Sequence, residues 1–189
     1  DNANPIVERV DFDFAHSGYA LCIVDSGADH ADLTDEYAAD TRDLKEVCAH
    51  FGKSVLREVP EEDFYAELPV LRRKAGDRAV LRAIHIYEDN RRVEGQVAAL
   101  RAGDFDTFLK LVTASGLSSW RCLQNVIPAG YTHHQEVAVA LTVCEKLLNG
   151  RGACRVHGGG FAGTIQAFVP LDMLDRFQTE MERILGDGS

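Results

Sequence analysis

The chain has 189 residues, 46% of them hydrophobic, and carries a formal net charge of −10 at pH 7. This composition is typical of a globular protein, and the acidic balance argues against a nucleic-acid partner or an anionic membrane surface. No apolar run approaches the roughly 20 residues that a membrane-spanning helix requires. We therefore expect one large domain, or a domain with an appendage, with no nucleic-acid or membrane partner.

The first residues and the cysteines indicate the cellular compartment of the protein. The chain begins with Asp1 instead of Met, so we expect that an upstream segment has been removed. Its first ten residues have neither the basic nor the apolar part of a secretory signal. The five cysteines form no C-x-x-C pair, and their number is odd. We interpret them as reduced thiols of a cytoplasmic protein.

The N-terminal part of the chain favours two strands. Residues 6–14 alternate apolar and charged side chains, a pattern typical of a half-buried strand. Residues 16–18 are typical of a turn, and residues 19–24 of a second, more buried strand. Residues 25–34 are rich in turn-forming and capping residues, which predicts a loop.

Four long helices are expected next. The first carries apolar side chains at helical spacing between residues 37 and 51. The second is expected over roughly 77–102, and the third starts at Asp104. The fourth opens with a predicted capping box of Thr132 and Gln135.

The C-terminal part predicts two short strands around a glycine loop, at residues 153–157 and 164–169, with Pro170 in the first turn of a last helix. The strands at 19–24, 153–157 and 164–169 are expected to be neighbours in one sheet. The whole order predicts an α+β fold, a small antiparallel sheet with several long helices packed mainly on one face.

The glycine loop matches the dinucleotide-binding spacing G-x-G-x-x-G through Gly158, Gly160 and Gly163. That fingerprint requires a helix directly after the glycines, whereas the following T-I-Q-A-F-V favours a strand. We therefore exclude a Rossmann site. Two interpretations stay open: a hairpin in which glycine only permits close backbone approach, or an anion-facing loop whose amides approach a ligand or another loop.

The segment GACRVHGGGFAGTIQAFVP resembles the third motif of galactokinases, G-A-R-L-T-G-x-G-F-G-G, within the GHMP family of small-molecule kinases. The matching residues are Arg155, Gly158, Gly160, Phe161 and Gly163. His157 stands where the family usually has Thr, and Ala162 where it has Gly.

Two further segments resemble the same family, and the three occur in the family's order. Residues 24–47 are similar to a stretch containing S-E-Y, and the residues at or near matching places are Ser26, His30, Glu36, Tyr37 and Arg42. Residues 82–119 are similar to a helical stretch ending in S-H-x-S-L. In that stretch Ser115 and Ser118 match, and Gly116 replaces the histidine.

The resemblance is to the C-terminal part of a galactokinase. It implies a ferredoxin-like GHMP kinase C-terminal domain over residues 19–189, with residues 1–18 left over from an N-terminal kinase domain. It also implies ATP and Mg²⁺ as cofactors, bound mostly by that missing domain, and phosphoryl transfer to the anomeric hydroxyl of galactose or a related sugar. The implied partners are this N-terminal domain and the sugar, and the chain alone is expected to be inactive.

The resemblance also assigns site residues, with no catalytic residue and no metal ligand in this chain. Tyr37 is expected to contact the sugar. The residues expected to support the phosphate loop are Gly158, Gly159, Gly160, Phe161 and Gly163. A non-catalytic ligand-sensing or interaction module stays an alternative. So does a GHMP kinase for another small molecule, since His157, Ala162 and Gly116 depart from the galactokinase pattern.

Two other patterns do not indicate sites. Residues 114–120, ASGLSSW, echo the family's phosphate loop, but they end a predicted helix, so we expect Ser118 and Ser119 to act as helix caps. His133 and His134 are adjacent, and adjacent helical residues do not share a face that could hold a metal.

Overall fold

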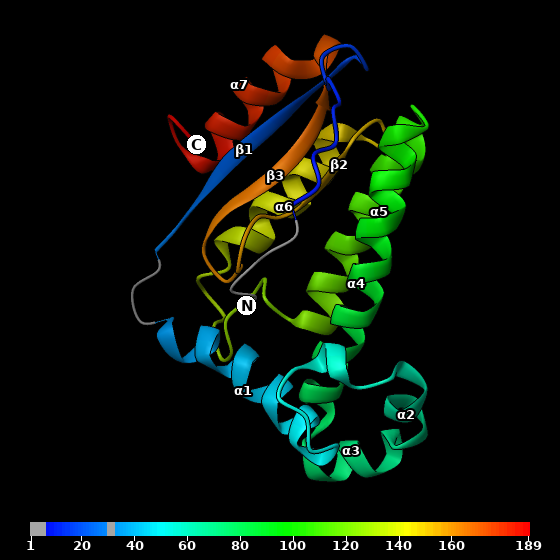
Figure 1. Cartoon of the computed structure of the whole chain (residues 1–189). Coiled ribbons are helices and arrows are strands. Elements are labelled where there is room, and N and C mark those ends of the chain that lie inside the picture. The colour runs from blue at the N-terminus through cyan, green and yellow to red at the C-terminus, as the bar shows by residue number, and fades with distance from the viewer. Residues whose placement is uncertain (1–6, 30–32) are drawn as a thin grey trace.

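The computed structural model of the chain describes residues 7–29 and 33–189. The strands are β1 (Tyr19–Ala28), β2 (Ala153–Val156) and β3 (Gly163–Pro170). The helices are α1 (Thr34–His50), α2 (Glu61–Ala66), α3 (Leu68–Lys74), α4 (Asp77–Arg101), α5 (Phe105–Ser118), α6 (Glu136–Leu148) and α7 (Leu174–Leu185). Figure 1 shows the sheet with α6 and α7 at one end of the molecule and α1, α2 and α3 at the other.

The three strands form one antiparallel sheet in the order β1-β3-β2. Tyr19 pairs with Pro170, and the register is regular as far as the pair of Asp25 with Thr164. It then shifts before Ala28 pairs with Gly163. The predicted α+β class and the predicted neighbourhood of the three strands are confirmed.

One face of the sheet is covered by α6 and α7. Side chains alternate along a strand, so Ile165, Ala167 and Val169 point to the same face, and each is 0% exposed within the core that α6 and α7 share. On the opposite face, Leu21 and Ile23 of β1 are half-exposed. The helix α5 packs along β2 at the edge of the sheet (Figure 1).

A second core lies at the other end of the molecule, where α1, α2, α3 and the first half of α4 pack together. Its centre includes Val47, Phe64, Leu71 and Ala83, all 0% exposed. The 25-residue helix α4 reaches from this core to α5, so it links the helical end to the sheet end.

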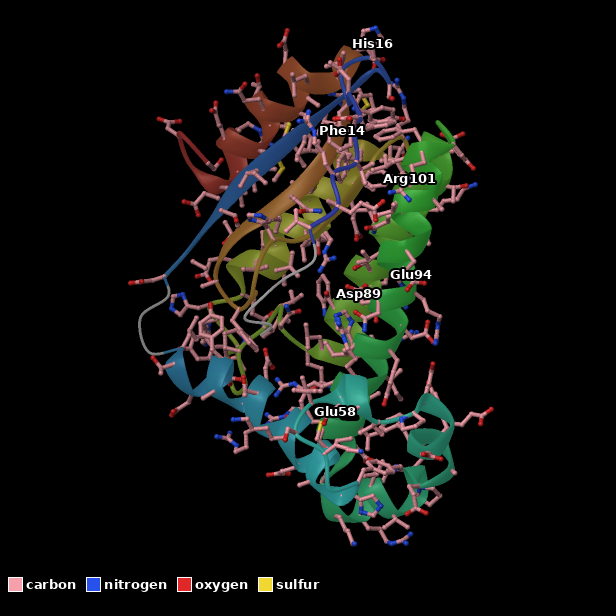
Figure 2. All side chains as sticks on the ribbon, in the orientation of Figure 1. Phe14, His16, Glu58, Asp89, Glu94 and Arg101 are labelled. Carbon is pink, nitrogen blue, oxygen red and sulfur yellow. The ribbon has the colours of Figure 1, made fainter. Side chains whose placement is uncertain are left out.

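The predicted strand over residues 6–14 is wrong. Ile6 lies outside the described residues, and residues 7–13 form neither helix nor strand. Phe12 stacks on Phe105 with ring centroids 5.6 Å apart, and Phe14 lies 5.3 Å from Phe168. Figure 2 shows Phe14 where this segment passes the sheet and α5. The alternation therefore reflects one side buried against an aromatic cluster, without strand pairing.

The predicted start of the third helix is confirmed, whereas the predicted start of the fourth is wrong. Asp104 caps α5, because its Oδ1 accepts from the N–H of Thr107 at 3.0 Å. The capping box is wrong, since α6 begins at Glu136 and the Nε2 of Gln135 donates to the carbonyl of Tyr131 instead.

The last helix also begins later than predicted. Pro170 ends β3, and a 3₁₀ turn at Leu171–Met173 separates it from Leu174, where α7 begins. The fixed φ of proline suits the end of the strand, since Pro170 pairs with Tyr19 at the edge of the ladder. The loop predicted at residues 25–34 is shorter, because β1 continues to Ala28.

Candidate functional site

The glycine loop connects β2 to β3 over residues 157–162. A strand begins at Gly163, so no helix N-terminus follows the glycines, and the exclusion of a Rossmann site is confirmed. The N–H of His157 donates to the carbonyl of Thr164 at 3.0 Å, which closes the base of the loop.

The loop has an exposed tip and a buried return. His157, Gly158 and Gly159 are exposed, whereas Phe161 and Ala162 are 3% and 2% exposed in a small apolar cluster with Leu33. Within the described residues, the N–H groups of Gly158 and Gly159 donate no hydrogen bond. Backbone N–H groups at an exposed turn are suited to face an anion.

Backbone conformation is unusual across the buried part of the loop. Gly160 has φ of +81°, and Phe161 has φ of +61°, a left-handed value that few non-glycine residues adopt. A Cβ atom on Gly160 would lie 2.1 Å from the backbone oxygen of Asn125. Glycine is therefore required at position 160 by both the backbone angle and the approach of a neighbouring chain segment.

Asn125 holds the loop from one side, a role that the sequence analysis missed. Its side chain is buried, and its Nδ2 donates to the carbonyl of Gly159 at 3.1 Å. Its backbone oxygen accepts from the N–H of Phe161 at 2.5 Å. Asn125 follows Gln124, which is left-handed with φ of +59°, and a single π-helical turn at Ser119–Leu123. No local sequence pattern marks this arrangement.

Tyr37 of α1 holds the loop from another side. Its hydroxyl donates to the carbonyl of Gly160 at 2.8 Å, and its ring meets that of Phe161 edge to face at 5.6 Å. Burial, followed by the nearby charge of Asp40, raises the pKa of Tyr37. The structure thus brings the predicted sugar-contact residue against the predicted phosphate-loop support. The sugar contact itself stays a prediction.

Other residues of the resembling segments also lie around this loop. The Oγ of Ser26 donates to the carbonyl of Gly163 at 2.5 Å, which ties β1 to the start of β3. The Oε1 of Glu36 accepts from the N–H of Ala129 at 2.9 Å. Arg42 is exposed on α1, and His30 lies outside the described residues.

Ser119 occupies the C-terminal cap position of α5 and Ser118 precedes the π-helical turn, as a capping role predicts, but their hydroxyls make other contacts. The Oγ of Ser118 lies 2.9 Å from the Nδ1 of the buried His85, and Ser119 accepts from Arg155 at 3.4 Å. Both hydroxyls therefore bind side chains of other elements. The segment lies inside α5 and the π-helical turn, so the exclusion of a phosphate loop there is confirmed.

A polar network joins α4, α5 and β2 beside these serines. Ser115 donates to Asp89 at 2.6 Å and accepts from Arg155 at 2.6 Å. Asp89 is directed from α4 toward the sheet (Figure 2). Burial lowers the pKa of His85, which favours its neutral form.

Gly116, which departs from the galactokinase pattern, lies where α5 closely approaches β2. A Cβ atom there would lie 3.0 Å from both the Cβ of Arg155 and the backbone oxygen of Cys154. This is tighter than ordinary van der Waals contact, so a larger residue at this position would require α5 or β2 to shift by a few tenths of an ångström.

The five cysteines are free thiols, as predicted. Burial raises the pKa of Cys22 and Cys48, which disfavours the thiolate that a nucleophile needs. Among the described residues, no helix is long and apolar enough to cross a membrane.

Comparison with known proteins places the chain among similar sequences and folds. No protein-family model matches it. Galactokinase from Actinobacillus pleuropneumoniae is 28% identical over 170 residues, 90% of this chain and 41% of that protein. Galactokinase from Haemophilus influenzae is 31% identical over 159 residues, 82% of this chain and 38% of that protein. A crystal structure of Lactococcus lactis galactokinase complexed with galactose matches with a TM-score of 0.68 at 22% identity, covering 89% of this chain and 42% of that chain.

The fold, a small antiparallel sheet with helices packed against it, matches part of a solved galactokinase structure. In both fold and sequence the chain is galactokinase-like, and it is consistent with the C-terminal part of such a protein. It spans about two fifths of the length of the curated relatives that it matches, 41% in the case of the Actinobacillus protein.

Proposed function

We propose that this chain is the C-terminal domain, over residues 19–189, of an ATP-dependent sugar kinase. The reaction is phosphoryl transfer from ATP to the anomeric hydroxyl of galactose or a related sugar, in the cytoplasm. A domain outside this chain supplies the catalytic groups and most of the binding site for ATP and Mg²⁺. The observation that carries the proposal is the alignment of the chain with galactokinases over 90% of its length.

The glycine loop fits a supporting role toward the phosphate groups of ATP. Gly158 and Gly159 present N–H groups that donate no hydrogen bond within the described part of the chain, and they lie at an exposed tip. Phosphoryl transfer depends mainly on positioning and on neutralisation of charge. A loop whose return segment is buried and whose tip offers amides can act as a wall of such a site.

Tyr37 fits a sugar-contacting role because of its place beside this loop. Its ring packs against Phe161, and its hydroxyl is anchored to Gly160 at 2.8 Å. A tyrosine with an anchored, partly buried ring offers a sugar a rigid surface with a polar end. In this proposal Tyr37 orients the sugar relative to the transferred phosphoryl group.

The proposal is tested on a longer protein that carries this chain together with its upstream coding sequence. Purified protein is incubated with ATP, Mg²⁺ and a panel of hexoses, and formation of ADP and of the sugar 1-phosphate is measured. We expect turnover of galactose or a close stereoisomer. Lack of turnover with every sugar would favour the alternative of a non-catalytic module. Turnover of an unrelated small molecule would establish a GHMP kinase with a different substrate.

The 189-residue chain assayed alone provides the second half of this test. We expect no turnover above a control without enzyme, because the proposal places the catalytic groups in the other domain. Turnover by this chain alone would contradict the proposed division of labour between the domains.

A further inference from the structure

Arg82 of α4 is the largest side chain buried almost completely in the described residues, at 1% exposure. Its guanidinium makes three contacts to two different elements. The Nη1 donates to Asp43 at 2.6 Å, and the Nη2 lies 2.7 Å from Asp40, both on α1. The Nε donates to the backbone oxygen of Leu123 at 3.1 Å.

These contacts connect the two segments that hold the glycine loop. Helix α1 carries Tyr37, whose hydroxyl binds the carbonyl of Gly160. Leu123 is two residues before Asn125, which binds both the carbonyl of Gly159 and the N–H of Phe161. One guanidinium therefore fixes the spacing between α1 and the segment of Asn125, and that spacing determines where the loop is held.

Stability alone does not account for such a cluster. A buried ion pair loses much of its attraction to the desolvation of its charges, and well-packed apolar residues often replace it without loss of stability. What the guanidinium provides is geometry, since its planar group donates in several fixed directions at once. Lysine carries all of its donors on one nitrogen, whereas Arg82 reaches Asp40, Asp43 and Leu123 from three different nitrogens.

We propose that Arg82 is a positioning residue for the glycine loop. It ties the helix that carries Tyr37 to the segment that carries Asn125, and so it sets the position of the loop between them. Within the described residues, the guanidinium binds Asp40, Asp43 and Leu123 and no atom of the loop, so it acts only through these two segments.

The test compares Arg82→Lys with Arg78→Lys. Arg78 donates to the same Asp43 at 2.7 Å, but from a partly exposed position and without a contact to Leu123 in the described residues. The two variants thus make the same chemical change on the same helix face, and only one of them removes the link to the segment of Asn125. Both retain a positive charge, which limits the risk that unpaired carboxylates unfold the protein.

The primary readout is amide hydrogen exchange in the 189-residue chain, measured by NMR. We expect Arg82→Lys to lower protection of the Phe161 amide at least about tenfold relative to that of the Cys144 amide in α6, by favouring local opening of the loop. Arg78→Lys is expected to change the protection of the Phe161 amide and of the Cys144 amide by less than about twofold each. Equal effects of the two variants on Phe161 would overturn the proposal, as would a parallel loss at Phe161 and Cys144 in Arg82→Lys.

A kinetic readout rests on the proposed kinase function. In the longer protein we expect Arg82→Lys to lower kcat at least about fivefold while the KM for the sugar changes less than about twofold, because the loop is displaced and the sugar contacts remain. An unchanged kcat would overturn the kinetic part of the proposal. Inactivity of the unmodified longer protein would instead count against the proposed function, and the exchange result would still decide the role of Arg82.

Discussion

The glycine loop joins two regions of the molecule that are held together by different forces. On the sheet side, β2 and β3 pack on α6 through apolar side chains such as Val156 and Ile165, which are 1% and 0% exposed. On the helical side, the loop is held by hydrogen bonds from Tyr37 and Asn125. Arg82 links the two segments that carry these residues, through its contacts with α1 and Leu123. Apolar packing stabilises without strong direction, whereas hydrogen bonds fix atoms to within tenths of an ångström. The difference indicates that the sheet side secures the fold and the helical side determines the loop conformation.

The largest effect is expected for Gly160→Val. Its Cβ would collide with the backbone oxygen of Asn125 at 2.1 Å, and valine disfavours a φ of +81°. Strain and overpacking together are expected to lower the free energy of unfolding by about 3 kcal/mol or more. Urea unfolding of the 189-residue chain measures this loss. Turnover per folded molecule in the longer protein is expected to fall as well, and unchanged turnover would show that the loop is structural only.

A second prediction concerns Asp40, whose pKa is raised to about 6, mainly by burial. The positive charge of Arg82 lowers this pKa, and the negative charge of Asp43 raises it. Its Oδ1 lies 2.7 Å from Arg82 without a well-aligned hydrogen bond in the described part of the chain, which agrees with an incompletely compensated charge. A raised carboxyl pKa means that the folded state binds the proton more tightly than the unfolded state. The contribution of Asp40 to stability therefore increases as the pH falls from above 6 toward 4 and is lost as the pH rises through 6.

The measurement compares urea unfolding at about pH 7.5 and about pH 4 in the unmodified chain and in Asp40→Asn. After allowance for partial solvent access, we expect Asp40 to contribute about 2 kcal/mol to the difference between the two pH values. Asp40→Asn has no carboxyl group at this position, so it should lack this part of the pH-dependent difference. The comparison between proteins is needed because the lowered pKa of His85 acts in the opposite direction, with stability lost as pH falls. An identical pH dependence in both proteins would show that the Asp40 carboxyl has an ordinary pKa.

Tyr37→Phe tests the hydrogen bond of Tyr37 to Gly160 on the helical side. It removes the donor to the carbonyl of Gly160 but keeps the ring contact to Phe161. The free energy of unfolding is expected to fall by about 1.5 kcal/mol, since a partly buried carbonyl loses its partner. If the hydroxyl also contacts the sugar, the KM for the sugar rises in the longer protein. A lower stability with an unchanged KM would leave Tyr37 as a support of the loop only.

The smallest effect is expected for Gly158→Ala at the exposed tip. A Cβ atom there meets nothing within 4 Å, so the cost is limited to a φ of +71°. We expect a loss of about 1 kcal/mol in the free energy of unfolding, measured as for Gly160→Val. A loss at Gly158 as large as that at Gly160 would mean that the contact with Asn125 adds little, and the contrast between the two sides of the loop would be wrong.

The sequence by itself determined the elements whose residues carry a local periodic pattern. The predicted helix over 77–102 matches α4 at Asp77–Arg101, and the three predicted strands of the sheet are present. The β-branched and aromatic residues after the glycines were also sufficient to exclude a Rossmann site, because they favour the strand that β3 forms. Periodicity succeeds here because burial on one face imposes it residue by residue. It failed at residues 6–14, because a segment packed on aromatic rings has the same alternation as a strand.

Only the tertiary structure decided how the glycine loop is held. The residues that meet there are far apart in the chain: Tyr37 and Gly160 are separated by 123 positions, and Arg82 and Leu123 by 41. The resemblance to galactokinases named Tyr37 and the glycines, but nothing in their spacing places one against the other. The left-handed Gln124 and Phe161 have no local sequence signature either. Such conformations exist because surrounding packing and hydrogen bonds over-determine the backbone, and those constraints arise only once the chain has folded.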